Sequence, residues 1–127
     1  MLFRSNFWQD FGRDWRAGRL YVPREVYDTC GASTADLDAG RMTPAWTEAL
    51  LACVRVTREH FAAGRLVCDG VRGRLKAELR FTWLGGSRIL DRVERGRAAL
   101  LDVRPALGAG DAASLAWGAL RWRKAAA

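Results

Sequence analysis

The sequence predicts an all-α protein with about four or five main helices. Apolar residues return every three or four positions through two long stretches, 43–63 and 71–95. On a helix with about 3.6 residues per turn, this spacing places them on one face. Near the amino terminus an aromatic residue recurs at every fourth position and also forms one helix face. Glycine and proline fall between these stretches, where helices end and begin. With half of its 127 residues hydrophobic, the chain has the composition of one globular domain.

The first predicted helix covers residues 3–17. It is expected to end at Gly18, because glycine adopts the left-handed conformation that commonly follows a helix without strain. One side of the helix is aromatic, with Phe3, Phe7, Phe11 and Trp15. We expect this stripe to pack against the rest of the chain.

Two short helices are predicted next. Pro23 suits the first position of a helix, which Gly31 would end. Ser33 and Asp36 have the spacing of a capping box that opens a second short helix, ended by Gly40. We expect this second helix to serve the fold only.

Two long helices and a last shorter one complete the prediction. The first long helix begins at Thr43-Pro44 and ends at Gly64, and its buried stripe is Trp46, Leu50, Val54 and Phe61. The second covers 71–95, and its buried side is Leu75, Leu79, Trp83, Ile89, Leu90 and Val93. Within it, Gly85-Gly86 permits either close packing of another helix or a bend. The last helix is capped by Asp111.

The chain has a formal net charge of +7, carried almost wholly by arginine. This charge suits anionic partners such as diphosphate esters or an anionic membrane surface. The arginines are spread along the chain and form no basic run, so we expect no nucleic-acid partner. There is no run of about 18 apolar residues and no apolar core of a signal peptide. We expect a cytoplasmic protein, with peripheral contact to the inner face of the membrane left open.

The few cysteines and the single histidine argue against several kinds of metal and catalytic site. The three cysteines, Cys30, Cys53 and Cys68, are isolated and lack the paired spacing of a zinc site or a disulfide framework. His60 is the one histidine, so neither an H-E-x-x-H zinc motif nor a Ser-His-Asp triad fits this chain.

Three oxygen-bearing side chains form a ladder on the first predicted helix. Asp10 and Asp14 are four residues apart and Asn6 lies one turn earlier, so all three share a face. Two like charges at this spacing repel each other, and Mg²⁺ is commonly held by one or two carboxylates together with substrate phosphates. The alternative is that the aspartates face water and pair with Arg13 and Arg16.

These residues resemble the second aspartate-rich motif of the squalene/phytoene synthase family. The family pattern is Asn, then D-x-x-x-D, then a short basic linker into an Arg-aromatic-Pro segment. In this chain the matching residues are Asn6, Asp10, Asp14, Arg19, Tyr21 and Pro23. The residues NFWQD (6–10) and DWRAGR (14–19) are most similar to the hydroxysqualene synthase branch of the family, which acts in bacterial hopanoid biosynthesis. The resemblance spans 1–127 as the C-terminal part of such a domain and implies a partial isoprenoid-synthase helical bundle.

The resemblance also implies the substrate and the site residues. Asp10 and Asp14 would bind Mg²⁺, with Asn6 as a further ligand, and Arg19 and Tyr21 would contact the oxygens of a presqualene or farnesyl diphosphate. From the residues alone, Arg19 is a surface charge and Tyr21 the edge of a core. The implied reaction is Mg²⁺-dependent conversion of presqualene diphosphate to hydroxysqualene with release of diphosphate. Head-to-head condensation of two prenyl diphosphates to squalene or phytoene is the alternative.

The chain departs from the family pattern in two places. Arg97-Ala98 replaces a glycine-tyrosine pair, and Val103 replaces one of two arginines, leaving Arg104. Both changes weaken the expectation that this end contributes phosphate ligands. The family also uses two aspartate-rich motifs, whereas this sequence has one D-x-x-x-D. We therefore expect a truncated half that is inactive without a missing N-terminal half or partner chain. A non-catalytic helical module that binds a partner or membrane is the alternative from another class.

Overall fold

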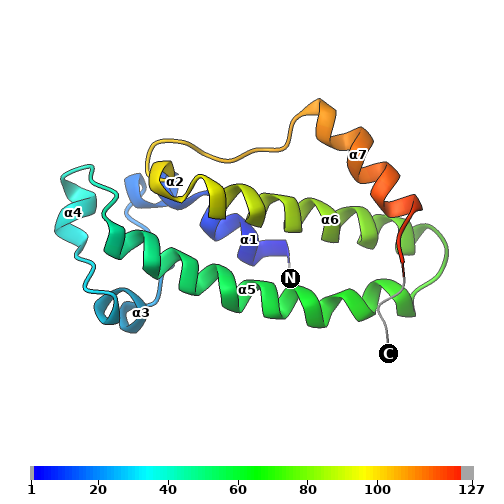
Figure 1. Cartoon of the computed structure of the whole chain (residues 1–127), viewed down its shortest axis with the longest axis horizontal. Helices are drawn as coiled ribbons and strands as arrows, with labels where there is room; N and C mark the ends of the chain where they lie inside the picture. The colour runs from blue at the N-terminus through cyan, green and yellow to red at the C-terminus, as the bar shows by residue number, and fades with distance from the viewer. Residues whose placement is uncertain (1, 124–127) are drawn as a thin grey trace.

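The computed structural model describes residues 2–123. Its elements are α1 (Leu2–Gln9), α2 (Phe11–Arg16), α3 (Arg24–Thr29), α4 (Thr34–Asp38), α5 (Pro44–Gly70), α6 (Gly73–Arg95), the 3-10 turn η1 (Arg97–Ala99) and α7 (Ala109–Leu120). The long helices α5 and α6 run antiparallel beside each other, α1 packs against both, and α7 lies on α6 (Figure 1). The predicted all-α class is confirmed, and no described helix is both long and apolar enough to cross a membrane.

The core lies where α5, α6 and α1 meet. The buried stripe expected on α5 is confirmed, since Trp46, Leu50, Val54 and Phe61 are at most 3% exposed. On α6, Ile89, Leu90 and Val93 are buried as expected. The prediction for Leu75 is wrong, because this residue is 52% exposed. At that end of α6 the side facing α5 passes through Leu79 and Trp83, which are half-buried.

The predicted end of α5 at Gly64 is also wrong. The helix continues to Gly70, and both Gly64 and Cys68 are buried within this extra length. Cys68 contacts α6, where its thiol donates to the carbonyl oxygen of Leu79 at 3.7 Å. A glycine inside a helix costs about 1 kcal/mol relative to alanine, and this packing offsets that cost. The chain reverses later, before Gly73, whose φ of +64° favours glycine.

Gly86 lets α5 and α6 approach closely. A Cβ atom at this position would stand 2.6 Å from Cε1 of Phe61. Nearby, the indole nitrogen of Trp83 donates to the carbonyl oxygen of Phe61 at 2.8 Å. Helix α6 runs through Gly85 and Gly86 without a break. Of the two interpretations left open for this glycine pair, tight packing therefore applies at Gly86.

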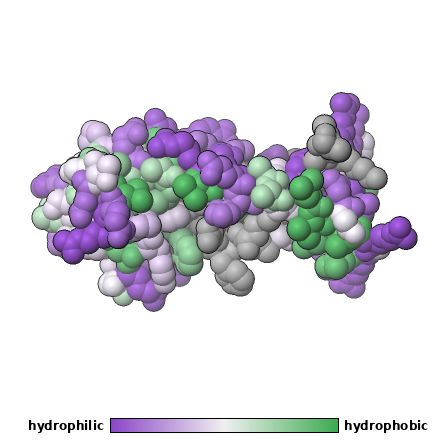
Figure 2. Space-filling model, turned by 90° about the horizontal axis from the view of Figure 1, so that it is seen from below, coloured by the Kyte–Doolittle hydropathy of each residue, from purple (hydrophilic) through white to green (hydrophobic). Residues whose placement is uncertain are grey.

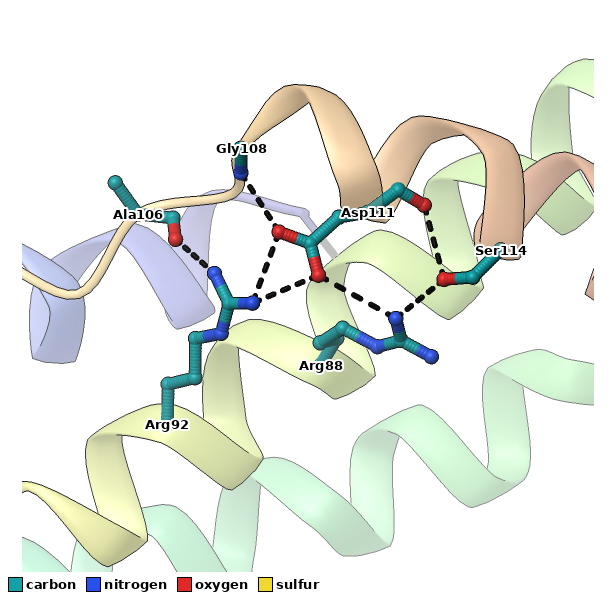
Figure 3. Close-up of polar contacts among 6 residues, drawn as sticks. All are labelled: Arg88, Arg92, Ala106, Gly108, Asp111 and Ser114. Atoms are coloured by element: carbon teal, nitrogen blue, oxygen red, sulfur yellow. Dashed lines mark hydrogen bonds and ion pairs between the residues drawn. The ribbon is translucent and has the colours of Figure 1, made fainter.

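Asp111 fixes the start of α7 on α6 (Figure 3). Its side chain caps the helix as expected, but from within the first turn of α7, three residues after the N-cap Gly108. Its Oδ2 accepts a hydrogen bond from the backbone N–H of Gly108 at 2.7 Å. Arg92 donates to both carboxylate oxygens at 2.7 and 2.8 Å, and Arg88 approaches Oδ1 at 3.4 Å. Arg92 also donates to the carbonyl oxygen of Ala106.

This network predicts that the attachment of α7 weakens in acid. The Gly108 N–H and the Arg92 guanidinium hold the pKa of Asp111 below its ordinary value. A lowered folded-state pKa gives stability that is fully present above the unfolded-state value and is lost as the pH falls through the folded one. The loss of unfolding free energy in Asp111→Asn, measured by urea denaturation, is therefore expected to shrink as the pH falls below about 4. Ser114→Ala removes a neutral partner of Arg88 and should show no such dependence; a parallel pH dependence in the two variants would contradict the prediction.

Candidate metal and diphosphate site

The predicted carboxylate ladder lies across the junction of two helices. The single helix expected over residues 3–17 is interrupted at Asp10, where α1 ends before α2 begins. The helical register nevertheless continues, because the N–H of Asp10 donates to the carbonyl of Asn6 and the N–H of Asp14 to that of Asp10, both at 2.8 Å. The three side chains therefore share one side of the α1–α2 segment, as the spacing predicts.

The aromatic residues of this segment lie about 100° or more around the helix from the carboxylate ladder and pack inward. Phe11 and Trp8 are 4% and 7% exposed, while Phe7 and Trp15 are half-buried. The indole nitrogen of Trp8 donates to the hydroxyl of Thr57 on α5 at 2.8 Å, which fixes the rotation of α1. The side chain of Phe3, the first of the expected stripe, lies outside the part of the chain that is described. With this side buried, Asn6 is exposed, and the side chains of Asp10 and Asp14 remain 25% and 14% exposed.

Gly18 ends α2 and brings Arg19 to Asp14. At a φ of +74° Gly18 reverses the chain, so that its N–H donates to the carbonyl of Trp15 and the N–H of Arg19 to that of Asp14. This pair of bonds is a Schellman motif, and it confirms the predicted helix end. The Arg19 guanidinium then donates to Oδ1 of Asp14 from Nε at 3.1 Å and from Nη2 at 2.8 Å. These hydrogen bonds raise the pKa of Arg19 above its ordinary value.

Asp10 is paired with an arginine that the sequence did not assign to the site. Nε of Arg104 donates to Oδ1 of Asp10, and Nη1 of Arg13 lies 3.7 Å from the same oxygen. The segment carrying Arg104 is held against α1 by Gln9, whose Nε2 donates to the carbonyl oxygen of Pro105 at 2.6 Å. The sequence did single out Arg104 as the one arginine that remains of a pair in the family pattern. No local rule, however, links residue 104 to residue 10. Arg104 is therefore a site residue that sequence reasoning missed.

Two clefts are lined in part by residues of α1, and neither is lined by Asp10 or Asp14. One has a volume of about 360 Å³ and is lined by α1, α6 and the segment before α7, including Asn6, Gln9, Phe81, Gly85, Arg104 and Leu107. The other has a volume of about 380 Å³ and is mainly apolar, lined by Phe7, Trp8, Tyr21, Val26, Cys53 and Val56 among others. Tyr21 is 43% exposed and stacks on Phe7, with ring centroids 4.3 Å apart. Tyr21 thus borders an apolar cleft, while Arg19 contacts Asp14 directly.

The donor atoms fit Mg²⁺ in one particular way. Asp10, Asp14 and Asn6 offer oxygen atoms, the ligands that Mg²⁺ prefers. Within residues 2–123 no group of three or more His, Cys, Asp or Glu side chains could hold a metal. A Mg²⁺ ion held here would need further oxygen ligands, such as water or substrate phosphates. Of the alternative pairing with Arg13 and Arg16, the first holds, since Arg13 lies 3.7 Å from Asp10, whereas Arg16 donates to the carbonyl oxygen of Leu101. Each carboxylate also meets a further arginine, Arg104 or Arg19.

Comparison with known proteins gives two matches. The model of the family described as squalene/phytoene synthase matches residues 3–111. The chain is also similar to "Phytoene synthase 3, chloroplastic" of Zea mays, with 40% identity over 42 residues, which cover 33% of this chain and 10% of that protein. No solved structure matches the chain. Because the family model covers well over half of the sequence, including Asn6, Asp10, Asp14, Arg19 and Tyr21, the chain belongs to the squalene/phytoene synthase family.

Proposed function

We propose that this chain supplies one carboxylate pair of a Mg²⁺-dependent prenyl diphosphate site. The observation that carries the proposal is the placement of Asp10 and Asp14 on one half-exposed side of α1–α2, each beside an arginine. Carboxylates that hold a divalent cation next to guanidinium groups match the charge pattern of a diphosphate with its metal. Family membership favours the same substrate class.

Each residue has a distinct proposed role. Asp10 and Asp14 bind the cation, and Asn6 contributes an amide oxygen at the edge of the site. When bound, Mg²⁺ would supply positive charge that stabilises the departing diphosphate. Arg19 and Tyr21 bind the phosphate oxygens, with Arg19 leaving Asp14 as the substrate enters. The mainly apolar cleft at Phe7 and Tyr21 keeps water away from the hydrocarbon chain.

The hydroxysqualene synthase reaction is the proposed chemistry. The bond between carbon and diphosphate oxygen in presqualene diphosphate breaks, and diphosphate leaves with the electron pair. A water oxygen then bonds to the resulting carbocation and loses a proton, giving hydroxysqualene without any oxidant or reductant. The residues around Asp10 and Asp14, NFWQD and DWRAGR, support this branch. Head-to-head condensation of two prenyl diphosphates uses the same carboxylates and remains the second candidate, in keeping with the similarity to a phytoene synthase.

We further propose that turnover needs a second carboxylate pair from outside these residues. The sequence contains one D-x-x-x-D, and the family chemistry uses two. A partner chain or additional segment would face Asp10 and Asp14 across the substrate. The isolated chain is then a binding half that is cytoplasmic or peripheral to the membrane, and it should retain Mg²⁺-dependent affinity for diphosphate without forming product.

The test is binding of inorganic pyrophosphate and farnesyl diphosphate by isothermal titration calorimetry, with Mg²⁺ or with EDTA. Wild-type chain is expected to bind both ligands only with Mg²⁺. Asp10→Asn and Asp14→Asn remove the charge but keep the side-chain shape, and each is expected to weaken binding by about tenfold or more.

Asp28→Asn is the matched control for these variants. Asp28 forms an exposed i,i+4 pair with Arg24 at 3.3 Å, so this variant loses a carboxylate–arginine contact of the same kind at another place. Its affinity should equal that of the wild type. Equal weakening in all three variants would mean that the loss is not specific to Asp10 and Asp14, and binding unaffected by EDTA would refute the metal role.

A further inference from the structure

The outer side of α7 is apolar and exposed. Ala113, Ala116, Trp117 and Leu120 follow the i, i+3, i+4, i+7 spacing of one helix face. Trp117 is 59% and Leu120 79% exposed. The other side of the helix packs on α6 through Leu115, which is 2% exposed. Because residues 112–120 include no charged residue, α7 is apolar on both sides, and a helix of this kind is normally covered on both sides.

A groove between α6 and α7 extends this apolar face. Its volume is about 660 Å³, and its apolar walls include Ala77 and Phe81 of α6 with Ala116, Ala119 and Leu120 of α7. Phe81 is 41% exposed. The stripe and the groove share Ala116 and Leu120, so they form one continuous area. We call Phe81, Ala113, Ala116, Trp117 and Leu120 the α7 surface.

The rim of the α7 surface is positively charged. The guanidinium of Arg121 lies 5.2 Å from the centre of the Trp117 ring, and Lys76 lines the groove. The acidic residue of the groove, Glu78, is neutralised by Arg74 at 2.6 Å. Tryptophan beside arginine at the edge of an apolar helix face is typical of segments that lie in the interface of a bilayer, where the ring has an apolar body and a polar edge.

We propose that the α7 surface docks on an anionic lipid bilayer. The helix, with 12 residues, lies in the membrane plane, with Trp117 and Leu120 entering the boundary between headgroups and acyl chains. Arg121 and Lys76 contact anionic headgroups, and the net charge of +7 draws the whole chain toward such a surface. This proposal uses none of the residues of the diphosphate site, so it stands or falls independently of the proposed function.

The test is co-sedimentation of the full chain with vesicles of phosphatidylcholine, alone or mixed with phosphatidylglycerol. Wild-type chain is expected to pellet with the mixed vesicles and several-fold less with phosphatidylcholine alone, and added salt should weaken its binding. The double variant Trp117→Glu/Leu120→Glu is expected to lower the partition coefficient for mixed vesicles at least about tenfold. Asp10→Asn should bind vesicles as the wild type does.

Leu66→Glu is the control for an added negative charge at another place. The end of the molecule where α5 stops carries further hydrophobic residues (Figure 2), and Leu66 in the last turns of α5 is 62% exposed. This variant adds one negative charge, where the double variant adds two, at another exposed apolar position, and its affinity is expected to stay within a few-fold of the wild type. Circular dichroism checks that all variants are folded.

Three results would overturn the proposal. The first is absence of wild-type binding to either vesicle. The second is equal loss of binding in Leu66→Glu and in the double variant, which would mean that added charge and not the α7 surface decides. The third is a wild-type dimer in sedimentation velocity that the double variant converts to a monomer, without vesicle binding by either, because a second copy of the chain would then cover this surface.

Discussion

Replacing Gly12 by alanine is expected to lower the free energy of unfolding by about 2–3 kcal/mol. A Cβ atom at Gly12 would stand 2.0 Å from the carbonyl oxygen of Leu101 and 2.9 Å from that of Leu100. These are backbone atoms of two buried residues, so they cannot move aside as the tip of a side chain could. Alanine is otherwise the better helix residue by about 1 kcal/mol, so the expected loss comes entirely from the broken fit between α2 and the segment after η1.

The effect of this change is expected to reach the candidate site. Arg16 donates to the carbonyl oxygen of Leu101 at 2.9 Å, and Arg104 of the same segment pairs with Asp10. A methyl group at Gly12 that pushes Leu101 outward should therefore loosen Arg104 as well. Gly12→Ala should alter Mg²⁺-dependent pyrophosphate binding at temperatures where the variant is still folded.

Urea denaturation followed by far-ultraviolet circular dichroism measures the stability change. Gly110→Ala is the control, because Gly110 also lies in a helix, and a Cβ atom there would meet nothing within 4 Å. That variant is expected to be neutral or up to about 1 kcal/mol more stable. Similar stability changes in the two variants would show that the contact with Leu101 does not limit the size of residue 12.

The parts of the fold that follow from local rules could be predicted from the sequence. The stripe at Trp46, Leu50 and Val54 is buried because its period matches the helix. Gly18 ends α2 because a helix of this sequence needs a residue that tolerates positive φ there. The shared side of Asp10 and Asp14 likewise depends only on helical spacing.

The errors arise where distant contacts outweigh a local preference. Glycine has a low helix propensity, so Gly64 was predicted to end the helix. The helix continues because Cys68, beyond Gly64, packs on α6. Leu75 fits the apolar period of α6, but it lies on the side that neither α5 nor α7 covers. Arg104 reaches Asp10 from a segment that Gln9 holds against α1 through the carbonyl oxygen of Pro105. Arg104 and Asp10 are 94 residues apart, so no local pattern could indicate this pair.

Replacing Trp122 by alanine is expected to have the second large effect on stability. Its ring meets Trp83 edge-on, with centroids 5.3 Å apart. The guanidinium carbons of Arg65 and Arg80 lie 4.1 and 5.3 Å from the ring centre. Its indole nitrogen donates to Asp69 at 2.9 Å. Through these contacts Trp122, which follows α7, joins the last turns of α5 to the first half of α6. Removing the ring should cost about 2–3 kcal/mol, toward the lower end for large aromatic truncations because Trp122 is half-buried.

Trp117→Ala is the control that separates the loss of buried contacts from the loss of a tryptophan as such. It is the same substitution at a ring that is 59% exposed and contacts Arg121, so the expected loss is below about 1 kcal/mol. Trp122→Phe keeps an aromatic ring but not the donor to Asp69, and it should fall between the two, because Asp69 still has Arg80 as an ionic partner at 3.3 Å. If urea denaturation gives equal losses for Trp122→Ala and Trp117→Ala, the cluster around Trp122 does not hold α7 in place. A loss confined to Trp122→Ala would instead show that this ring, beyond the end of α7, anchors the helix to the long pair α5 and α6.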